Sequence, residues 1–129
     1  MNRADYIPAP HKFNLNMACR ALAEAFGPHI FLVGSAHEKR DYRDVDVRVM
    51  LPDEDWERLF PGLDPGRAQL DPLWSIMCAA ISLYLSQHSD LPVDFQIQQR
   101  TKANEEYPKE KRGPLGLFAA RPEVNGRVE

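Results

Sequence analysis

Hydrophobic residues recur along the chain with two different periods, and these periods predict the order of helices and strands. From residue 13 apolar residues return at helical spacing until Gly27-Pro28. Glycine favours the end of a helix and proline cannot continue one, so we expect this helix to end there. Residues 1–11 lack such a period, and we expect them to be extended. The helical stripe consists of Phe13, Met17, Leu22 and Phe26.

Three segments have the pattern of β-strands. Residues 30–33 (IFLV) form a short apolar run that Gly34-Ser35 closes, which is typical of a buried strand. Residues 44–51 (DVDVRVML) alternate polar and apolar positions, so the valines face one way and Asp44, Asp46 and Arg48 the other. Residues 93–98 (VDFQIQ) alternate in the same manner, with Asp94 on the polar side.

Two further helices are predicted between the second and third strands. Residues 52–60 begin with proline and three acidic residues, which suit the start of a helix. Residues 71–89 form a long helix with one broad apolar face, which we expect to pack against the core. That face consists of Leu73, Ile76, Met77, Ala80, Leu83 and Tyr84.

This order predicts one domain over residues 1–129, of α/β (α+β) class, in which helices flank a small mixed sheet. Its core is expected at about residues 13–100, and residues 101–129 form a charged C-terminal extension. Proline and glycine between residues 61 and 66 predict a turn before the long helix. The segment 36–43 (AHEKRDYR) is strongly polar and is expected at the surface.

Composition narrows the class of protein without naming a function. The chain has 129 residues and a formal net charge of −3, so no overall basic character points to nucleic acid. Its apolar runs are too short for a bilayer and its N-terminus lacks the apolar region of a signal peptide. Cys19 and Cys78 lie far apart within helical patterns, so we expect reduced core thiols in a cytoplasmic protein with no membrane partner.

The carboxylates on the polar faces of two strands are the strongest candidates for chemistry. Asp44 and Asp46 share one face, and Asp94 would join them if its strand lies next to theirs. Clustered carboxylates repel one another unless a cation lies between them, and oxygen ligands of this kind suit Mg²⁺ or Mn²⁺. Each acid alone is equally well read as a solvent-facing strand residue, and Arg48 either pairs with Asp46 or contacts a substrate.

Gly34-Ser35 and the polar segment after it offer groups that bind phosphate. A glycine and a serine after a buried strand present backbone N–H groups and a hydroxyl, although the pair is also an ordinary turn sequence. Lys39, Arg40 and Arg43 follow in the surface segment and would neutralise phosphate charge, or form a solvated loop.

The combined pattern resembles the DNA polymerase beta-like nucleotidyltransferase superfamily, and within it the small minimal nucleotidyltransferases. The matching stretches are LVGS (32–35), DVDV (44–47) and VDF (93–95). The resemblance implies a nucleotidyltransferase-like fold and transfer of a nucleoside monophosphate from a nucleoside triphosphate such as ATP to a hydroxyl or phosphate acceptor. It implies that Gly34 and Ser35 hold the triphosphate, that Asp44, Asp46 and Asp94 bind Mg²⁺ (or Mn²⁺), and that Asp94 helps deprotonate the acceptor.

The sequence departs from this pattern between Ser35 and Asp44. The eight-residue spacer is short, and Arg43 replaces the serine that often precedes the first aspartate. With no second domain, the acceptor is open and includes a small molecule or RNA. The alternative function is a partner-dependent or non-catalytic binding module on the same fold, an antitoxin-like protein that pairs with a helical HEPN-type partner. A degenerate structural copy is a weaker third reading.

Overall fold

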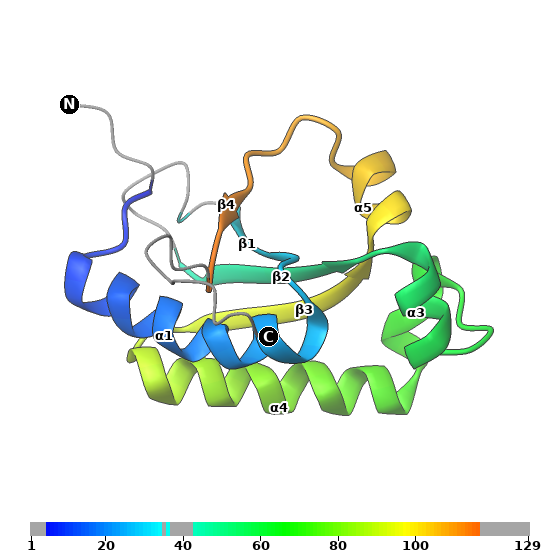
Figure 1. Cartoon of the computed structure of the whole chain (residues 1–129), viewed down its shortest axis with the longest axis horizontal. Helices are drawn as coiled ribbons and strands as arrows, with labels where there is room; N and C mark the ends of the chain where they lie inside the picture. Colours follow the sequence, from blue (N-terminus) through cyan, green and yellow to red (C-terminus); the bar gives the residue numbers. More distant parts are fainter. Residues whose placement is uncertain (1–4, 35, 37–42, 117–129) are drawn as a thin grey trace, which may run out of the picture.

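The computed structural model describes residues 5–34, 36 and 43–116, which form a small mixed sheet with helices on both faces (Figure 1). This confirms the predicted fold class. The elements, in chain order, are α1 (Ala9–Phe26), β1 (Ile30–Val33), β2 (Val45–Leu51), α3 (Asp53–Leu59), the 3₁₀ helix η1 (Pro65–Leu70), α4 (Pro72–Ser89), β3 (Val93–Gln99), α5 (Arg100–Glu106) and β4 (Gly113–Pro114).

The sheet has the strand order β3-β2-β1-β4 and contains both kinds of pairing. β2 runs parallel to β3 and antiparallel to β1, while β4 pairs antiparallel with β1. The connection between the parallel strands is long, because it holds α3, η1 and α4, as a crossover requires. α1 and α4 lie side by side across one face of the sheet, and α5 lies on the opposite side (Figure 1).

The alternation in the strand sequences explains which face of the sheet is the core. Val45, Val47 and Val49 of β2 are fully buried, and Phe95 and Ile97 of β3 are almost fully buried, on the face that α1 and α4 cover. The intervening residues point to the opposite face, where the polar ones have intermediate exposure and Met50 is buried against Val33 and Ala103. Strand period two therefore sorts the side chains as the sequence predicted, and it leaves a polar row beside the core.

β3 is an edge strand of the sheet, and side chains of α4 hydrogen-bond to its free edge. Val93 N–H donates to Ser86 Oγ at 3.0 Å, and Phe95 N–H donates to Ser82 Oγ at 2.9 Å. Trp74 Nε1, eight residues before Ser82, also reaches this edge with its longer side chain and donates to the Ile97 carbonyl oxygen at 2.9 Å. Four helical residues rise about 6 Å and two strand residues about 6.6 Å, so side chains four apart on α4 match alternate residues of β3. We call this set of bonds the edge ladder.

α4 also shows where the sequence prediction was wrong. Its expected core face is divided: Met77 and Tyr84 are partly buried and pack against the core, but the other apolar residues face solvent. Leu73 is 53% exposed, Ile76 66% and Leu83 59%. The helix is apolar on more than one side, and helical spacing alone does not tell which side meets the core. We call the exposed set the outward stripe: Leu73, Ile76, Ala80 and Leu83.

The first helix differs from its prediction in two ways. α1 begins at Ala9, within the segment expected to be extended, because a proline near the first turn of a helix is tolerated. The predicted stripe is only partly on the buried side: Leu22 is buried and Phe26 packs against the core, but Phe13 is 61% and Met17 44% exposed. The buried residues are Leu15, Ala18, Cys19 and Leu22.

The segment after residue 100, expected to be an extension, contributes α5 and β4 to the packed structure. Leu115 is buried and its N–H donates to the Ile30 carbonyl oxygen at 2.9 Å. Residues 117–129 lie outside the described residues. Both cysteines are free and buried, and burial raises the pKa of Cys19 to about 12 and that of Cys78 to about 11, as expected of unreactive core thiols. Within the described ranges, no helix combines the length and apolarity needed to span a membrane.

We expect Ser82→Ala to lower the free energy of unfolding by about 1–3 kcal/mol, because the Phe95 N–H loses its acceptor. Ser75→Ala is the matched control on the same helix, since the Ser75 hydroxyl has only one hydrogen bond to the described residues, a long one of 3.4 Å to the Gln69 carbonyl oxygen at the surface. The free energy of unfolding of Ser75→Ala should fall by no more than about 0.5 kcal/mol. Urea denaturation of both variants measures the difference, and equal losses would show that the edge ladder does not stabilise the fold.

Candidate functional site

The parallel pairing of β2 and β3 brings two of the three predicted carboxylates together. Asp46 and Asp94 are register partners in neighbouring strands, so both side chains leave the same face of the sheet at the same level. Asp46 is also the register partner of Val33, the last residue of β1. The carboxylate pair therefore lies where β1 ends, next to Gly34.

Asp44 lies just before β2 and is exposed, so it is less closely held than the other two acids. Its charge still acts on Asp46, whose pKa it helps to raise. Among the described residues no group of three histidine, cysteine or acidic side chains is arranged to hold a metal ion. The structure thus brings together the pair Asp46 and Asp94, and leaves Asp44 at its margin.

An arginine supplies the positive charge between the two carboxylates. Arg48 Nη2 lies 3.3 Å from Asp94 Oδ2 and 3.8 Å from Asp46 Oδ1. Its Nη1 donates to the carbonyl oxygens of Asp94 at 2.7 Å and Val47 at 3.0 Å. The guanidinium side chain is only 12% exposed. Of the two sequence readings for Arg48, pairing with the aspartates is the one that the structure shows.

The pKa of Asp46 is raised above its ordinary value of 3.8 despite this arginine. Burial is the largest cause, and the charges of Asp94, Asp44 and Glu110 act in the same direction, whereas Arg48 lowers the pKa. A carboxyl group with a raised pKa beside a second carboxylate is a frequent feature of functional sites, although structural ion pairs produce it as well.

Gly34 closes one side of this pair. It has φ +75°, a left-handed conformation that residues with a side chain rarely adopt. A Cβ atom placed on it would lie 2.2 Å from Asp46 Oδ2. The glycine therefore permits both the turn and the close approach of the carboxylate to the backbone. Ser35, Lys39 and Arg40, predicted with Gly34 to bind phosphate, lie outside the described residues; Arg43 is described and is exposed.

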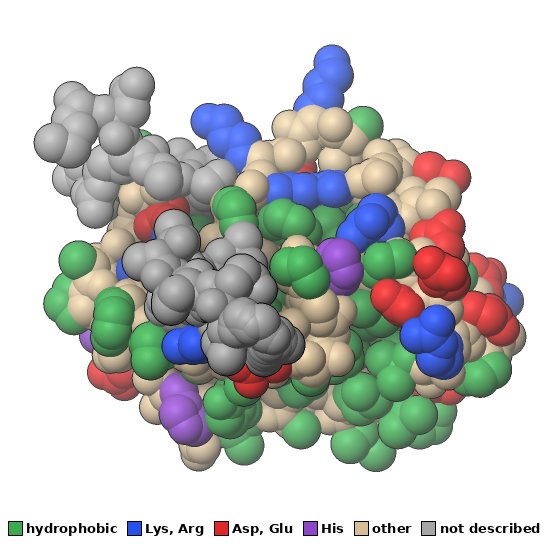
Figure 2. Space-filling model, in the orientation of Figure 1, with side chains coloured by type: hydrophobic (Ala, Val, Ile, Leu, Met, Phe, Trp, Pro, Cys, Tyr) green, Lys and Arg blue, Asp and Glu red, His purple; other side chains and the backbone are tan. Residues whose placement is uncertain are grey.

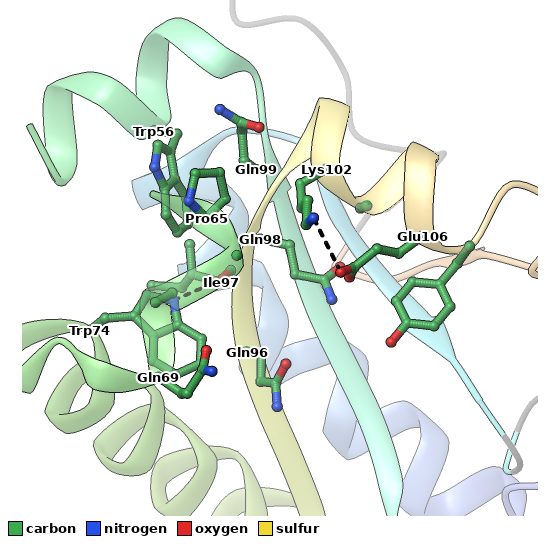
Figure 3. A pocket seen from close by; sticks show the side chains of 14 residues that line it. Trp56, Pro65, Gln69, Trp74, Gln96, Ile97, Gln98, Gln99, Lys102 and Glu106 are labelled. Atoms are coloured by element: carbon green, nitrogen blue, oxygen red, sulfur yellow. Dashed lines mark hydrogen bonds and ion pairs between the residues drawn. The ribbon is translucent and has the colours of Figure 1, made fainter. Parts of the chain in front are cut away.

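A polar pocket that the sequence did not reveal adjoins the carboxylate pair along β3. Its volume is about 270 Å³, and it lies between η1, β3 and α5 (Figure 3). Gln96 and Gln98 follow Asp94 on the same face of the strand and line it, as does Gln69. Across the pocket, Lys102 and Glu106 form an ion pair at 3.5 Å. Glutamines at alternate strand positions were the available signal, but only the fold shows that helices enclose them.

Gln98 carries an unusual polar group within this pocket. Its Oε1 atom is buried and has no hydrogen-bond partner among the described residues. A buried acceptor of this kind costs free energy unless a donor reaches it. Figure 3 shows the Gln98 amide pointing toward Glu106. The pocket is thus rich in amide groups, while its one lysine is neutralised by a carboxylate.

We expect Gly34→Ala to destabilise the protein by about 2–4 kcal/mol, because a strained backbone angle adds to a clash with Asp46. Gly62→Ala is a matched control: its φ is +74°, and no atom of the described residues lies within 4 Å of the position of its Cβ. The free energy of unfolding of this control should fall only by the cost of placing alanine at a positive φ, about 1–2 kcal/mol. Equal losses in chemical denaturation would contradict the close approach of Gly34 and Asp46.

The raised pKa of Asp46 predicts a pH-dependent contribution to stability. An acid whose pKa is higher in the folded state binds its proton more tightly there, so its contribution is complete below its ordinary pKa and is lost as pH rises through the raised value. We therefore expect Asp46→Asn to gain stability relative to the natural protein between pH 3.5 and pH 7. Urea denaturation across that range measures it, and a constant difference would refute the shift.

Comparison with protein-family models, with curated proteins and with solved structures found no match to this chain. The resemblance to nucleotidyltransferases therefore stays a prediction that the LVGS, DVDV and VDF stretches carry. What the structure adds is their placement: Gly34, Asp46 and Asp94 meet at one end of the open face of the sheet.

Proposed function

We propose that this protein is a Mg²⁺-dependent nucleotidyltransferase that moves a nucleoside monophosphate from a nucleoside triphosphate to a hydroxyl or phosphate acceptor. The observation that carries the proposal is the in-register pair Asp46 and Asp94 beside Gly34. Two adjacent carboxylates on a half-open sheet face are the ligands that Mg²⁺ or Mn²⁺ prefers. Because Gly34 has no side chain, its backbone lies directly beside Asp46, where a phosphate bound to the ion would also be held.

The residues fit such an ion if Arg48 moves aside. Asp46 and Asp94 would hold it, with Asp44 reaching from the margin of the site, and the bound ion would supply charge stabilisation for the phosphoryl group being transferred. A bound divalent cation would displace the Arg48 guanidinium, because both compete for the same carboxylate oxygens. Once displaced, it remains close enough to contact phosphate oxygens, for which arginine is well suited.

The reaction needs an acceptor oxygen to attack the α-phosphorus while the bond to the β-phosphate oxygen breaks and pyrophosphate leaves. Asp94 is the more exposed member of the pair, with 48% of its side chain accessible, and is therefore better placed to take the acceptor proton. The polar pocket begins at Gln96, two residues after Asp94 on β3. Its glutamines offer amide groups of the kind that pair with nucleobase edges. We assign the nucleoside base of one substrate to it.

Calorimetry with Mg²⁺ and a non-hydrolysable ATP analogue tests the proposal. We expect binding by the natural protein, at least tenfold weaker binding by Asp46→Ala and Asp94→Ala, and unchanged binding by Glu105→Ala. Glu105 is an exposed acid on α5, so its variant removes the same charge at a different place. Binding that is absent from the natural protein, or indifferent to both aspartates, would contradict the proposal.

The second candidate is a non-catalytic binding module on the same fold, in which a helical HEPN-type protein is the partner. The bridging position of Arg48 favours it, since a permanent arginine would replace the metal and leave a structural ion cluster. Arg48→Gln separates the two functions. In the enzyme it removes a competitor, so Mg²⁺ binding without nucleotide becomes tighter; in the binding module it only lowers stability, by about 1–3 kcal/mol.

A further inference from the structure

The outward stripe of α4 is an apolar surface that the described part of the chain does not cover. A helix at the surface of a protein normally carries charged and polar residues on its solvent side. None of the 18 residues of α4 is aspartate, glutamate, lysine or arginine. Figure 2 shows hydrophobic side chains along the lower edge of the molecule, where α4 lies in Figure 1.

The spacing of the outward stripe is that of a helix–helix contact. Its members follow one another at intervals of three, four and three residues, from Leu73 through Ile76 and Ala80 to Leu83. This is the a/d spacing with which one helix packs against another by inserting side chains between those of its neighbour. Scattered surface leucines do not keep this period, so the stripe points to a helix as its occupant.

The other sides of α4 are already engaged, which fixes the direction of the stripe. The edge ladder holds one side against β3 through Ser82 and Ser86. Met77 and Tyr84 pack against the core. Nδ1 of His11 in α1 lies 3.1 Å from the Ser89 carbonyl oxygen. Rotating the helix to bury Ile76 would break both sets of contacts, so the stripe stays outward in the folded chain.

We propose that the occupant is the α4 helix of a second copy of this protein, packed antiparallel to the first. In this arrangement Leu73 meets Leu83 of the other copy, and Ile76 meets Ala80. Each large side chain at the centre then faces a small one, and all four members of the stripe find a partner. A parallel dimer would instead place Ile76 against Ile76 and Ala80 against Ala80, which leaves the layers uneven.

Charge also favours a second copy over an unlike partner. The positions that flank the stripe carry no ionic groups, for example Met77, Ala79 and Tyr84. In helix pairs that must choose an unlike partner, the flanking positions usually carry the charges that make the choice. Two copies of α4 meet here without repulsion between like charges. In the antiparallel orientation the two helix dipoles lie side by side in opposite directions, so the positive end of each helix is next to the negative end of the other.

Light scattering after gel filtration, at protein concentrations up to about 200 µM, tests the proposal because a dimer of micromolar Kd is populated there. We expect twice the mass of the 14.7 kDa chain for the natural protein. Leu83→Glu and Leu73→Lys, each alone, should have the mass of the single chain. Tyr107→Glu is the control, since Tyr107 is an exposed apolar residue away from α4 and its change should preserve the dimer.

Mixing the two stripe variants tests the orientation. In the antiparallel dimer Lys introduced at position 73 of one copy meets Glu at position 83 of the other, so the mixture should regain the doubled mass. Circular dichroism of each variant shows that the fold is intact, as expected for exposed positions. A single-chain mass for the natural protein overturns the proposal, as does a dimer that both charge variants retain. A mixture that stays at the single-chain mass overturns the antiparallel arrangement.

Discussion

The contact between α4 and the outer edge of β3 determines both surfaces to which we assign a function. β3 has β2 on one side and the edge ladder on the other, so its position is fixed from both directions. That position places Asp94 level with Asp46 on the open face. The same bonds set the rotation of α4, and with it the direction in which the outward stripe points. A single set of side-chain to backbone bonds thus links the carboxylate pair to the helix surface on the far side of the sheet.

The electrostatics of the open face follow from one arginine between two acids. Without a cation, the in-register carboxylates would repel at close range, and the raised pKa of Asp46 shows that Arg48 does not fully offset this effect and the cost of burial. Arg48 is itself held by two backbone carbonyl oxygens, so it is part of the sheet as well as of the site. A protein that binds Mg²⁺ here exchanges one cation for another, whereas a binding module keeps the arginine.

The sequence predicts the strands better than it predicts the faces of the helices. Period two in DVDVRVML has only two possible faces, and the valines identify the buried one. Helices offer a continuous choice, and α4 is apolar on several sides, so Leu73 and Ile76 were wrongly expected in the core. The pairing of Asp46 with Asp94 was a conditional prediction, because it required that the two strands be neighbours. The pocket was not predictable, since it depends on how η1 and α5 pack around Gln96 and Gln98.

The match between helix and strand periods has a consequence for how this sequence can vary. Substitutions along α4 change one contact at a time, but inserting or deleting a single residue between Ser82 and Ser86 would turn the following part of the helix by about 100°. The Ser86 hydroxyl would then no longer face Val93. Related chains should therefore differ in length within their loops and keep α4 free of gaps. The spacing of hydroxyl residues in this helix, rather than their surroundings, is the feature by which distant relatives could be recognised.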